Sequence, residues 1–152
     1  MPNADLRARI RQFLAEHTTL TLATVGEDGR PQAAALFYAE TPALHLIFIS
    51  EAKTRHSRNI ASNPRIAATI QSDGQSWSEI QGLQLEGLCE PLSGKDAARA
   101  RQVYLDKFPF IGQNKVLEMA LSLVTFYRIT PTWIRLIDNR RGFGHKEELR
   151  LA

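Results

Sequence analysis

The chain has 152 residues, 43% of them hydrophobic and 23% charged, with a formal net charge of +3 at pH 7. This composition is typical of a globular protein and argues against disordered and fibrous classes, and the length fits one domain over residues 1–152. The longest apolar runs are far shorter than the roughly 20 residues that a membrane-spanning helix needs, so no membrane association is expected.

The N-terminal stretch MPNADLRARIRQFL alternates arginines with apolar residues and lacks the continuous apolar core of a secretory signal. Cys89 is the only cysteine of the sequence, which agrees with a reducing compartment. We therefore expect a cytoplasmic protein in which Cys89 is a small buried residue without a chemical role.

The first half of the chain predicts one helix and then short strands. Apolar residues recur at helical spacing over Asn3–His17, with the arginines on the other face. Two-residue alternation predicts strands at 18–25 and 32–39, joined as a hairpin by GEDGRP. Apolar runs predict two further strands at 44–50 and 65–71.

The segment between these two runs, Lys53–Ser62, predicts a short helix. Thr54 is a candidate N-cap, and the breaker Asn63-Pro64 follows the helix. After the loop SDGQSWS, a long fifth strand is expected at 80–92, where Gly82 and Gly87 indicate a bulge or sharp bend.

The last third predicts helices and then more strands. Ser93 is expected to cap a helix at 94–108, and FPFIGQN separates it from a short helical piece at 115–122. The breaker Thr130-Pro131 predicts two separate strands, and the tail contains a glycine-aromatic turn and a last short strand. These two strands are expected at 123–129 and 133–137.

About seven short strands joined mostly by tight turns predict a mainly β protein with peripheral helices (α+β), built as an antiparallel barrel or sandwich. A doubly wound parallel sheet would need a helix after nearly every strand. The GxxxxGK[ST], GxGxxG, HExxH and CxxC motifs are absent, and the four histidines lack ligand spacing, so no metal site is predicted.

The stretch SEAKTRHSRNIASNP, residues 50–64, places hydroxyls and cations between two apolar strands. Ser50 and Thr54 carry hydroxyl donors, and Lys53 and Arg55 carry charge beside the predicted N-terminus of a helix, where backbone N–H groups and the helix dipole favour a phosphate. Residue chemistry alone leaves two interpretations open, an anion-binding site and a solvated loop. His56 is either a phosphate contact or a surface residue of the helix.

The order of a strand, then S-x-x-x-T-R-H, then a short helix ending in Asn-Pro, resembles the FMN-binding split barrels related to pyridoxamine 5'-phosphate oxidase. Ser50, Thr54 and Arg55 match the family's phosphate-binding pattern position by position. KTRH together with DNRRGFGHK is similar to the uncharacterised bacterial YhbP-like branch of that superfamily.

This resemblance implies a homodimeric antiparallel split β-barrel that binds FMN, or a similar phosphorylated flavin or deazaflavin, in a groove between subunits. The backbone around Leu36 and Phe37 would flank the flavin ring, and the chemistry would be hydride transfer in an oxidoreductase of unknown substrate. The phosphate would be held by Ser50, Lys53, Thr54, Arg55 and His56.

The chain also departs from the family pattern. His56 stands where the family usually has lysine, and Gln81-Gly82 stands where it has an Arg-Gln pair that contacts the flavin from the partner subunit. The C-terminal arginine and histidine signature for the substrate is replaced by DNRRGFGH, so true pyridoxamine 5'-phosphate oxidase activity is not expected. The turn Gly142-Phe143-Gly144 either covers a flavin or substrate or is a plain hairpin turn.

Two other functions remain open at this stage. A non-catalytic protein that binds flavin or another small ligand in the same groove is the first alternative. The second is a nucleic-acid-binding barrel that uses the basic clusters with Phe143 as a stacking residue. The sequence does not favour nucleic acid, because aromatic residues are not regularly interleaved among the basic ones.

Overall fold

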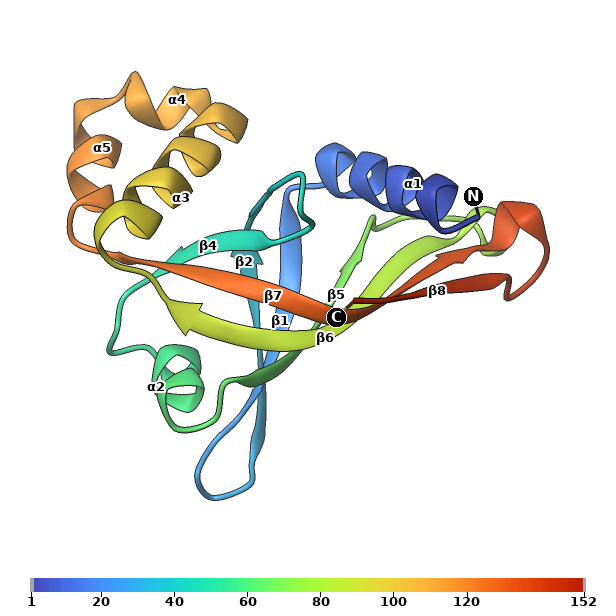
Figure 1. The fold of residues 1–152 in the computed structure, drawn as a ribbon, viewed down its shortest axis with the longest axis horizontal. Coiled ribbons are helices and arrows are strands. Elements are labelled where there is room, and N and C mark those ends of the chain that lie inside the picture. Colours follow the sequence, from blue (N-terminus) through green and yellow to red (C-terminus); the bar gives the residue numbers. More distant parts are fainter. Residues whose placement is uncertain (1, 152) are drawn as a thin grey trace.

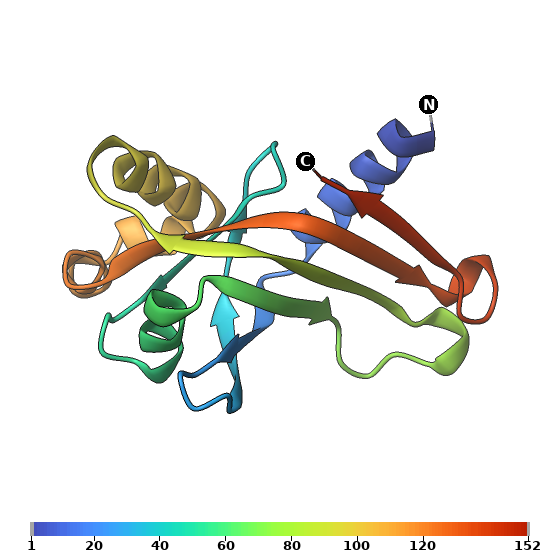
Figure 2. The same ribbon diagram turned by 60° about the horizontal axis from the view of Figure 1, so that its bottom comes forward.

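A curled eight-stranded antiparallel sheet forms the body of the protein in this computed structural model, which describes residues 2–151 (Figures 1 and 2). The strands are β1 (Thr19–Val25), β2 (Pro31–Phe37), β3 (Ala39–Glu40), β4 (Leu46–Ser50), β5 (Arg65–Gln71), β6 (Gln81–Pro91), β7 (Thr125–Asp138) and β8 (Lys146–Arg150). The helices are α1 (Pro2–Glu16), α2 (Arg55–Ser62), α3 (Gly94–Lys107), α4 (Pro109–Gly112) and α5 (Lys115–Leu121), with short 3₁₀ turns η1 (Trp77–Glu79) and η2 (Asn139–Arg141).

The strand order is β2-β1-β5-β6-β7-β4-β3, and β8 pairs with β7 outside this path. Strands β1 and β5 bury every second residue, the alternation expected when one face of a sheet is packed and the other is not. The structure therefore confirms the predicted mainly antiparallel architecture with helices at its periphery.

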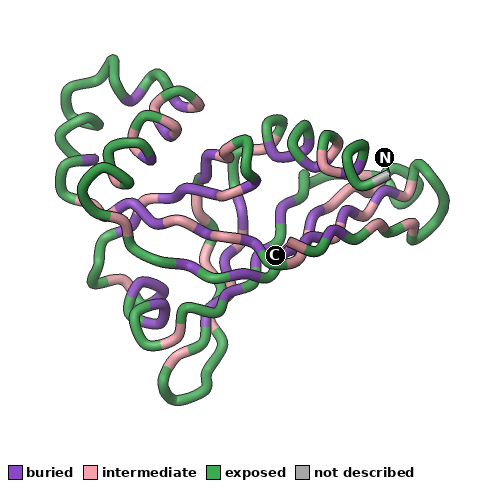
Figure 3. Tube along the Cα trace, viewed as in Figure 1, coloured by how far each residue is buried: buried purple, intermediate pink, exposed green. Residues whose placement is uncertain are grey.

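The main hydrophobic core lies inside the curl of the sheet and is covered by α1. Leu6, Ile10, Phe13 and Leu14 of α1 pack there, as their helical spacing predicts. A smaller second cluster joins α3 and the α4–α5 region to β4 and β7. Most of the α4 and α5 surface is exposed (Figure 3).

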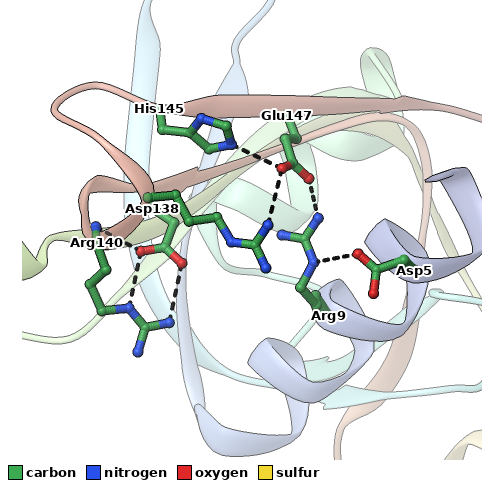
Figure 4. A network of polar contacts seen from close by, with 7 residues as sticks. Asp5, Arg9, Asp138, Arg140, His145 and Glu147 are labelled. Atoms are coloured by element: carbon green, nitrogen blue, oxygen red, sulfur yellow. Dashed lines mark hydrogen bonds and ion pairs between the residues drawn. The ribbon is translucent and has the colours of Figure 1, made fainter.

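The C-terminal strand is tied to α1 by charged side chains (Figure 4). Arg9 of α1 pairs with Asp5 at 3.0 Å and with Glu147 of β8. His145 contacts the same Glu147 carboxylate at 2.9 Å, and these two neighbours lower the pKa of Glu147. Because Glu147 is shared between two elements, the network fixes where β8 lies on the sheet. No helix within residues 2–151 is long and apolar enough to cross a membrane.

Strand β7 corrects the prediction of two strands at 123–129 and 133–137, because it runs unbroken through Pro131. Proline is tolerated inside a sheet where the hydrogen-bond ladder is already interrupted. The register of β6 against β7 shifts between Glu86 and Gly87, and Gly87 lies opposite Pro131. A bulge therefore occurs beside Gly87, as the glycines of β6 predict, but its extra residue is Thr132 of β7, and Gly87 leaves room for the proline opposite it.

Two smaller predictions also needed correction. Ser93 stands at the N-cap position of α3, but its side chain makes no capping hydrogen bond. His45 precedes β4 instead of lying inside a strand, and burial lowers its pKa. The predicted last short strand is confirmed as β8.

We expect Gly87→Ala to destabilise the fold by roughly 2 kcal/mol or more, the order of an overpacked core substitution. A Cβ atom at this position would lie 2.4 Å from the carbonyl oxygen of Thr130 and 2.8 Å from Cα of Pro131, both of them backbone atoms. Urea denaturation measures the change. Gly82→Ala in the same strand is the control, because its Cβ would meet nothing closer than 3.8 Å. Equal stability of the two variants would contradict a tight bulge beside Gly87.

Candidate functional site

The first turn of α2 is capped as the sequence predicts. Thr54 has extended backbone angles, and its hydroxyl oxygen accepts a hydrogen bond from the N–H of Ser57 at 3.3 Å. The N–H groups that precede this one have no acceptor within the helix and point out of its N-terminus. This end of α2 can therefore donate backbone hydrogen bonds to an anion.

A chain of side-chain hydrogen bonds connects β4 to this helix start. The Ser50 hydroxyl lies 2.7 Å from Nε2 of His56 and 3.1 Å from the Thr54 hydroxyl, which in turn lies 2.8 Å from the Ser57 hydroxyl. Ser50, His56 and Ser57 are all buried. The structure thus brings together three of the predicted site residues, Ser50, Thr54 and His56.

His56 is not a surface residue of the helix. Only 8% of its surface is exposed, and its ring packs edge-on against Phe48. Burial lowers the pKa of His56, so the imidazole is neutral at neutral pH. In the tautomer with hydrogen on Nε2, His56 donates to Ser50, whose own hydroxyl hydrogen is directed to the Glu51 carbonyl at 3.4 Å or to the Thr54 hydroxyl at 3.1 Å and would turn from them to reach a ligand. His56 then acts through Ser50, which it holds in position.

Asn59 is a residue of this site that sequence reasoning missed. Its side-chain amide is buried and donates to the Thr24 hydroxyl of β1 at 3.0 Å, which fixes α2 against the hairpin (Figure 1). An available signal was its position three residues after His56, on the same helical face. A polar residue on the buried face of a short helix needs a partner, and here the partner is Thr24.

The two predicted cations lie at the rim of the hydroxyl cluster. Lys53 is exposed and pairs with Glu51 at 3.2 Å, an arrangement that contributes little to stability. Arg55 is also exposed, and among residues 2–151 it forms no ion pair. Its guanidinium is therefore available to hold two oxygens of one phosphate.

The predicted ring-flanking residues lie elsewhere on the chain. Leu36 and Phe37 are at the end of β2 that is far from the hairpin turn, opposite Leu20 and Thr19. The Phe37 ring is 58% exposed and packs edge-on against Phe108, with ring centroids 5.8 Å apart. Within one chain, no hydrogen bond or ring contact of the described residues joins Leu36 or Phe37 to the Ser50 cluster.

Side chains of η2 hold the start of β6 at Gln81. Arg140 pairs with Asp138 at 3.0 Å, and the Gln81 amide, with its oxygen turned toward Arg140, accepts from the same guanidinium. The Asn139 side chain donates to the Trp77 carbonyl at 2.8 Å and accepts from the Gly144 N–H at 2.9 Å. The glycine-aromatic turn is thereby held in one shape, with Phe143 83% exposed.

The outer face of the sheet carries small residues in rows. Ala33, Ala23 and Ala67 lie side by side on β2, β1 and β5, and a second row joins Ala35, Thr21 and Thr69. An open groove of about 570 Å³ crosses β1, β5 and β6 on this face, with Val25 and Leu88 in its lining. The face is therefore grooved, largely apolar and accessible.

No group of three or more histidine, cysteine or acidic residues that could hold a metal ion occurs in the part of the chain that the structure describes. Cys89 is buried, as predicted, and burial raises the pKa of its thiol to about 12. The chemistry available at the α2 site is therefore anion binding by N–H groups, hydroxyls and one guanidinium.

Comparison with known proteins agrees with this geometry. Residues 6–138 match the family model described as pyridoxamine 5'-phosphate oxidase. A UPF0306 protein of Klebsiella pneumoniae is 30% identical over 93% of this chain and 91% of its own length.

Among solved structures, the conserved hypothetical protein Rv2991 of Mycobacterium tuberculosis superposes with a TM-score of 0.76 at 23% identity, covering 95% of this chain and 91% of that one. A heme binding protein of Mycobacterium smegmatis superposes with a TM-score of 0.75 at 22% identity, covering 92% of this chain and 55% of that one. At these identities the likeness concerns the fold.

We expect His56→Gln to reduce the pH dependence of stability between about pH 7.5 and pH 5. The unfolded chain titrates His56 near its ordinary pKa of about 6.5, whereas the folded pKa is lower, so below that pH the unfolded state binds more protons and the free energy of unfolding falls. Glutamine cannot titrate but keeps a hydrogen-bonding group toward Ser50.

Urea denaturation of both proteins at several pH values measures the slope. His45→Gln is the comparison variant, because burial also lowers the pKa of His45. It should remove the part of the pH dependence that His45 contributes and leave the part that His56 contributes. Parallel pH profiles for wild type and His56→Gln would show that His56 is not held neutral by the fold.

Proposed function

The chain belongs to the pyridoxamine 5'-phosphate oxidase family and to its UPF0306 relatives, and we propose that it is an FMN-binding split-barrel oxidoreductase of still undefined substrate. One observation carries this proposal: the N-terminus of α2, capped by Thr54, lies beside Arg55 and the buried Ser50–His56 pair. This donor set fits a phosphate monoester, because it combines backbone N–H groups, a hydroxyl and a guanidinium.

In this proposal the bound flavin supplies hydride transfer, and the protein supplies binding and orientation. Arg55 holds the phosphate, the Ser50 hydroxyl donates to it, and His56 sets the direction of that hydroxyl. Lys53 adds positive charge at the rim. No side chain of the described cluster has the arrangement of a nucleophile with its base and a third orienting group, so the substrate is expected to react at the cofactor.

The second subunit of the proposed homodimer would complete the site. No hydrogen bond or ring contact of the described residues joins Leu36 or Phe37, which flank the ring in the family pattern, to the Ser50 cluster within one chain. The outer rows of Ala33, Ala23 and Ala67 offer a surface on which a second copy can pack, since exposed apolar patches mark interaction sites. The flavin would then lie in the groove between the two copies.

A non-catalytic ligand-binding protein is the second candidate. The observation that favours it is the likeness to a heme binding protein, which has this fold and is named for a different ligand. In that case the same surfaces would hold a small ligand without turnover.

We expect purified protein to bind FMN at micromolar concentration, and Arg55→Ala to weaken binding about tenfold or more, since a bidentate charge-assisted contact is lost. Flavin fluorescence titration measures both. Arg99→Ala on α3 is the control, because it removes an equal charge from an exposed position on another element.

If FMN does not bind, the proposal is wrong. If Arg55→Ala binds FMN as tightly as wild type, the phosphate is not held at Arg55. A parallel titration with hemin tests the second candidate. Bleaching of bound flavin by NADH or NADPH, with turnover on an added acceptor, would support an enzyme, and unchanged colour would support a binder.

We expect Ala67→Glu to convert the proposed homodimer into monomers, because a carboxylate in the alanine row would be buried in the dimer interface without a partner. Light scattering after size-exclusion chromatography gives the mass of each species. Ala98→Glu, at an exposed position of α3, should leave the mass unchanged. A wild-type protein that is monomeric at high micromolar concentration would contradict the dimer.

A further inference from the structure

A groove between α2 and the β1–β2 hairpin contains Arg55 of the phosphate site and further charged residues that this site does not use. It has a volume of about 600 Å³ and contains Arg55 and Arg58 of α2 and Arg30 of the hairpin. Glu27 and Asp28 belong to the same lining. In Figures 1 and 2 the helix and the hairpin lie next to each other at one end of the sheet.

Both walls of the groove are fixed by hydrogen bonds. In the hairpin turn, the Gly26 N–H donates to the Arg30 carbonyl at 3.0 Å, and the Gly29 N–H donates to the Gly26 carbonyl at 2.9 Å. Asn59 ties α2 to β1 through Thr24. A Cβ atom at Gly26 would lie 3.2 Å from the Asn59 side-chain oxygen, so the two walls are closely apposed there. The groove is therefore formed before any ligand arrives.

Helix stability does not explain the two arginines of α2. Arg55 is the first residue of the helix and Arg58 is the fourth, and the first turn holds no acidic residue. Cations near a helix N-terminus oppose the helix dipole, and like charges three residues apart repel each other. Both side chains are exposed, and neither forms an ion pair within residues 2–151. Their placement is consistent with an anionic ligand.

The opposite wall has the complementary chemistry. Arg30 lies 3.5 Å from Asp28, but both side chains are largely exposed, so this pair is weak and readily exchanged. Guanidinium groups bind diphosphate oxygens in pairs, and carboxylates accept hydrogen bonds from ribose hydroxyls. Two guanidiniums without an ion pair among residues 2–151 and two carboxylates line the same groove, which matches a ligand that carries both phosphate and hydroxyl groups, as a nucleoside diphosphate does.

We propose that this groove binds the diphosphate and ribose of a nucleotide, so that the cofactor or its electron donor is a dinucleotide extending past Arg55 toward the hairpin. The proposal rests on the proposed flavin site, because Arg55 belongs to both. In this assignment Arg58 contacts the diphosphate but does not belong to the residues that hold the flavin phosphate. A substitution of Arg58 therefore tests the groove separately from the flavin site.

Isothermal titration of wild type with FMN, FAD and ADP tests this assignment, with Arg58→Gln as the variant. We expect ADP to bind wild type and FAD to bind about tenfold more tightly than FMN, as one additional charged contact provides. Arg58→Gln should weaken ADP and FAD about tenfold and leave FMN within twofold. Arg99→Gln, which removes one exposed charge from α3, should bind all three ligands like wild type.

The outcomes distinguish the groove from the flavin site. If FMN binds but ADP does not bind at millimolar concentration, or if Arg58→Gln weakens FMN and FAD equally, the groove assignment is wrong and the flavin proposal stands. If FMN fails to bind while ADP binds in an Arg58-dependent manner, the flavin proposal is wrong and the groove assignment stands. Circular dichroism of Arg58→Gln confirms that the variant is folded before either conclusion is drawn.

Discussion

The pairing of β6 with β7 is the constraint on which the rest of the structure depends. These are the two longest strands, and their ladder runs from Gln81 opposite Asp138 to Pro91 opposite Tyr127. Strand β5 adds to one edge of this pair, and β4 and β8 add to the other. Gly87 lets the backbone of β6 approach Pro131 closely beside the bulged Thr132 of β7, and bulges increase the local bend and twist of a sheet. The curl that encloses the core therefore depends on a glycine and a proline facing each other.

The sequence predicts the elements well where local chemistry decides them. The alternation in β1 and β5, the helical period of α1 and the Thr54 cap all have local causes, and all of them are confirmed. The continuous strand β7 was not predictable in the same way, because Pro131 breaks a strand unless the ladder shifts beside it and the partner strand leaves room for its ring. That information lies more than forty residues earlier in the chain, at Gly87, and only the register connects the two positions.

The candidate site also has one part that local sequence predicts and another part that depends on tertiary packing. Ser50, Thr54 and His56 could be assigned to one place because they lie within a few residues of a helix start, and the structure brings them within hydrogen-bonding distance. The burial of His56 against Phe48 and the bond from Asn59 to Thr24 depend on the packing of α2 onto the sheet, which local sequence does not encode. The relation of Leu36 and Phe37 to the phosphate site depends on a second copy and belongs to the proposed dimer.

The burial of His56 also determines where charge must come from when an anion binds. A lysine at this position would bring a permanent cation to the helix start, whereas the buried imidazole is neutral at neutral pH and offers only a hydrogen bond to Ser50. Lys53 is partly neutralised by Glu51, which leaves Arg55 as the main cation at the first phosphate. A dianionic phosphate held by one guanidinium is incompletely balanced, and Arg58 and Arg30 line the same hairpin groove as Arg55. With His56 neutral, the cations that can meet an anion therefore run from Arg55 at the helix N-terminus to Arg58 and Arg30 in the hairpin groove. In the proposed assignment, a ligand with its negative charge spread along that path would be bound better than one with all of its charge at Thr54.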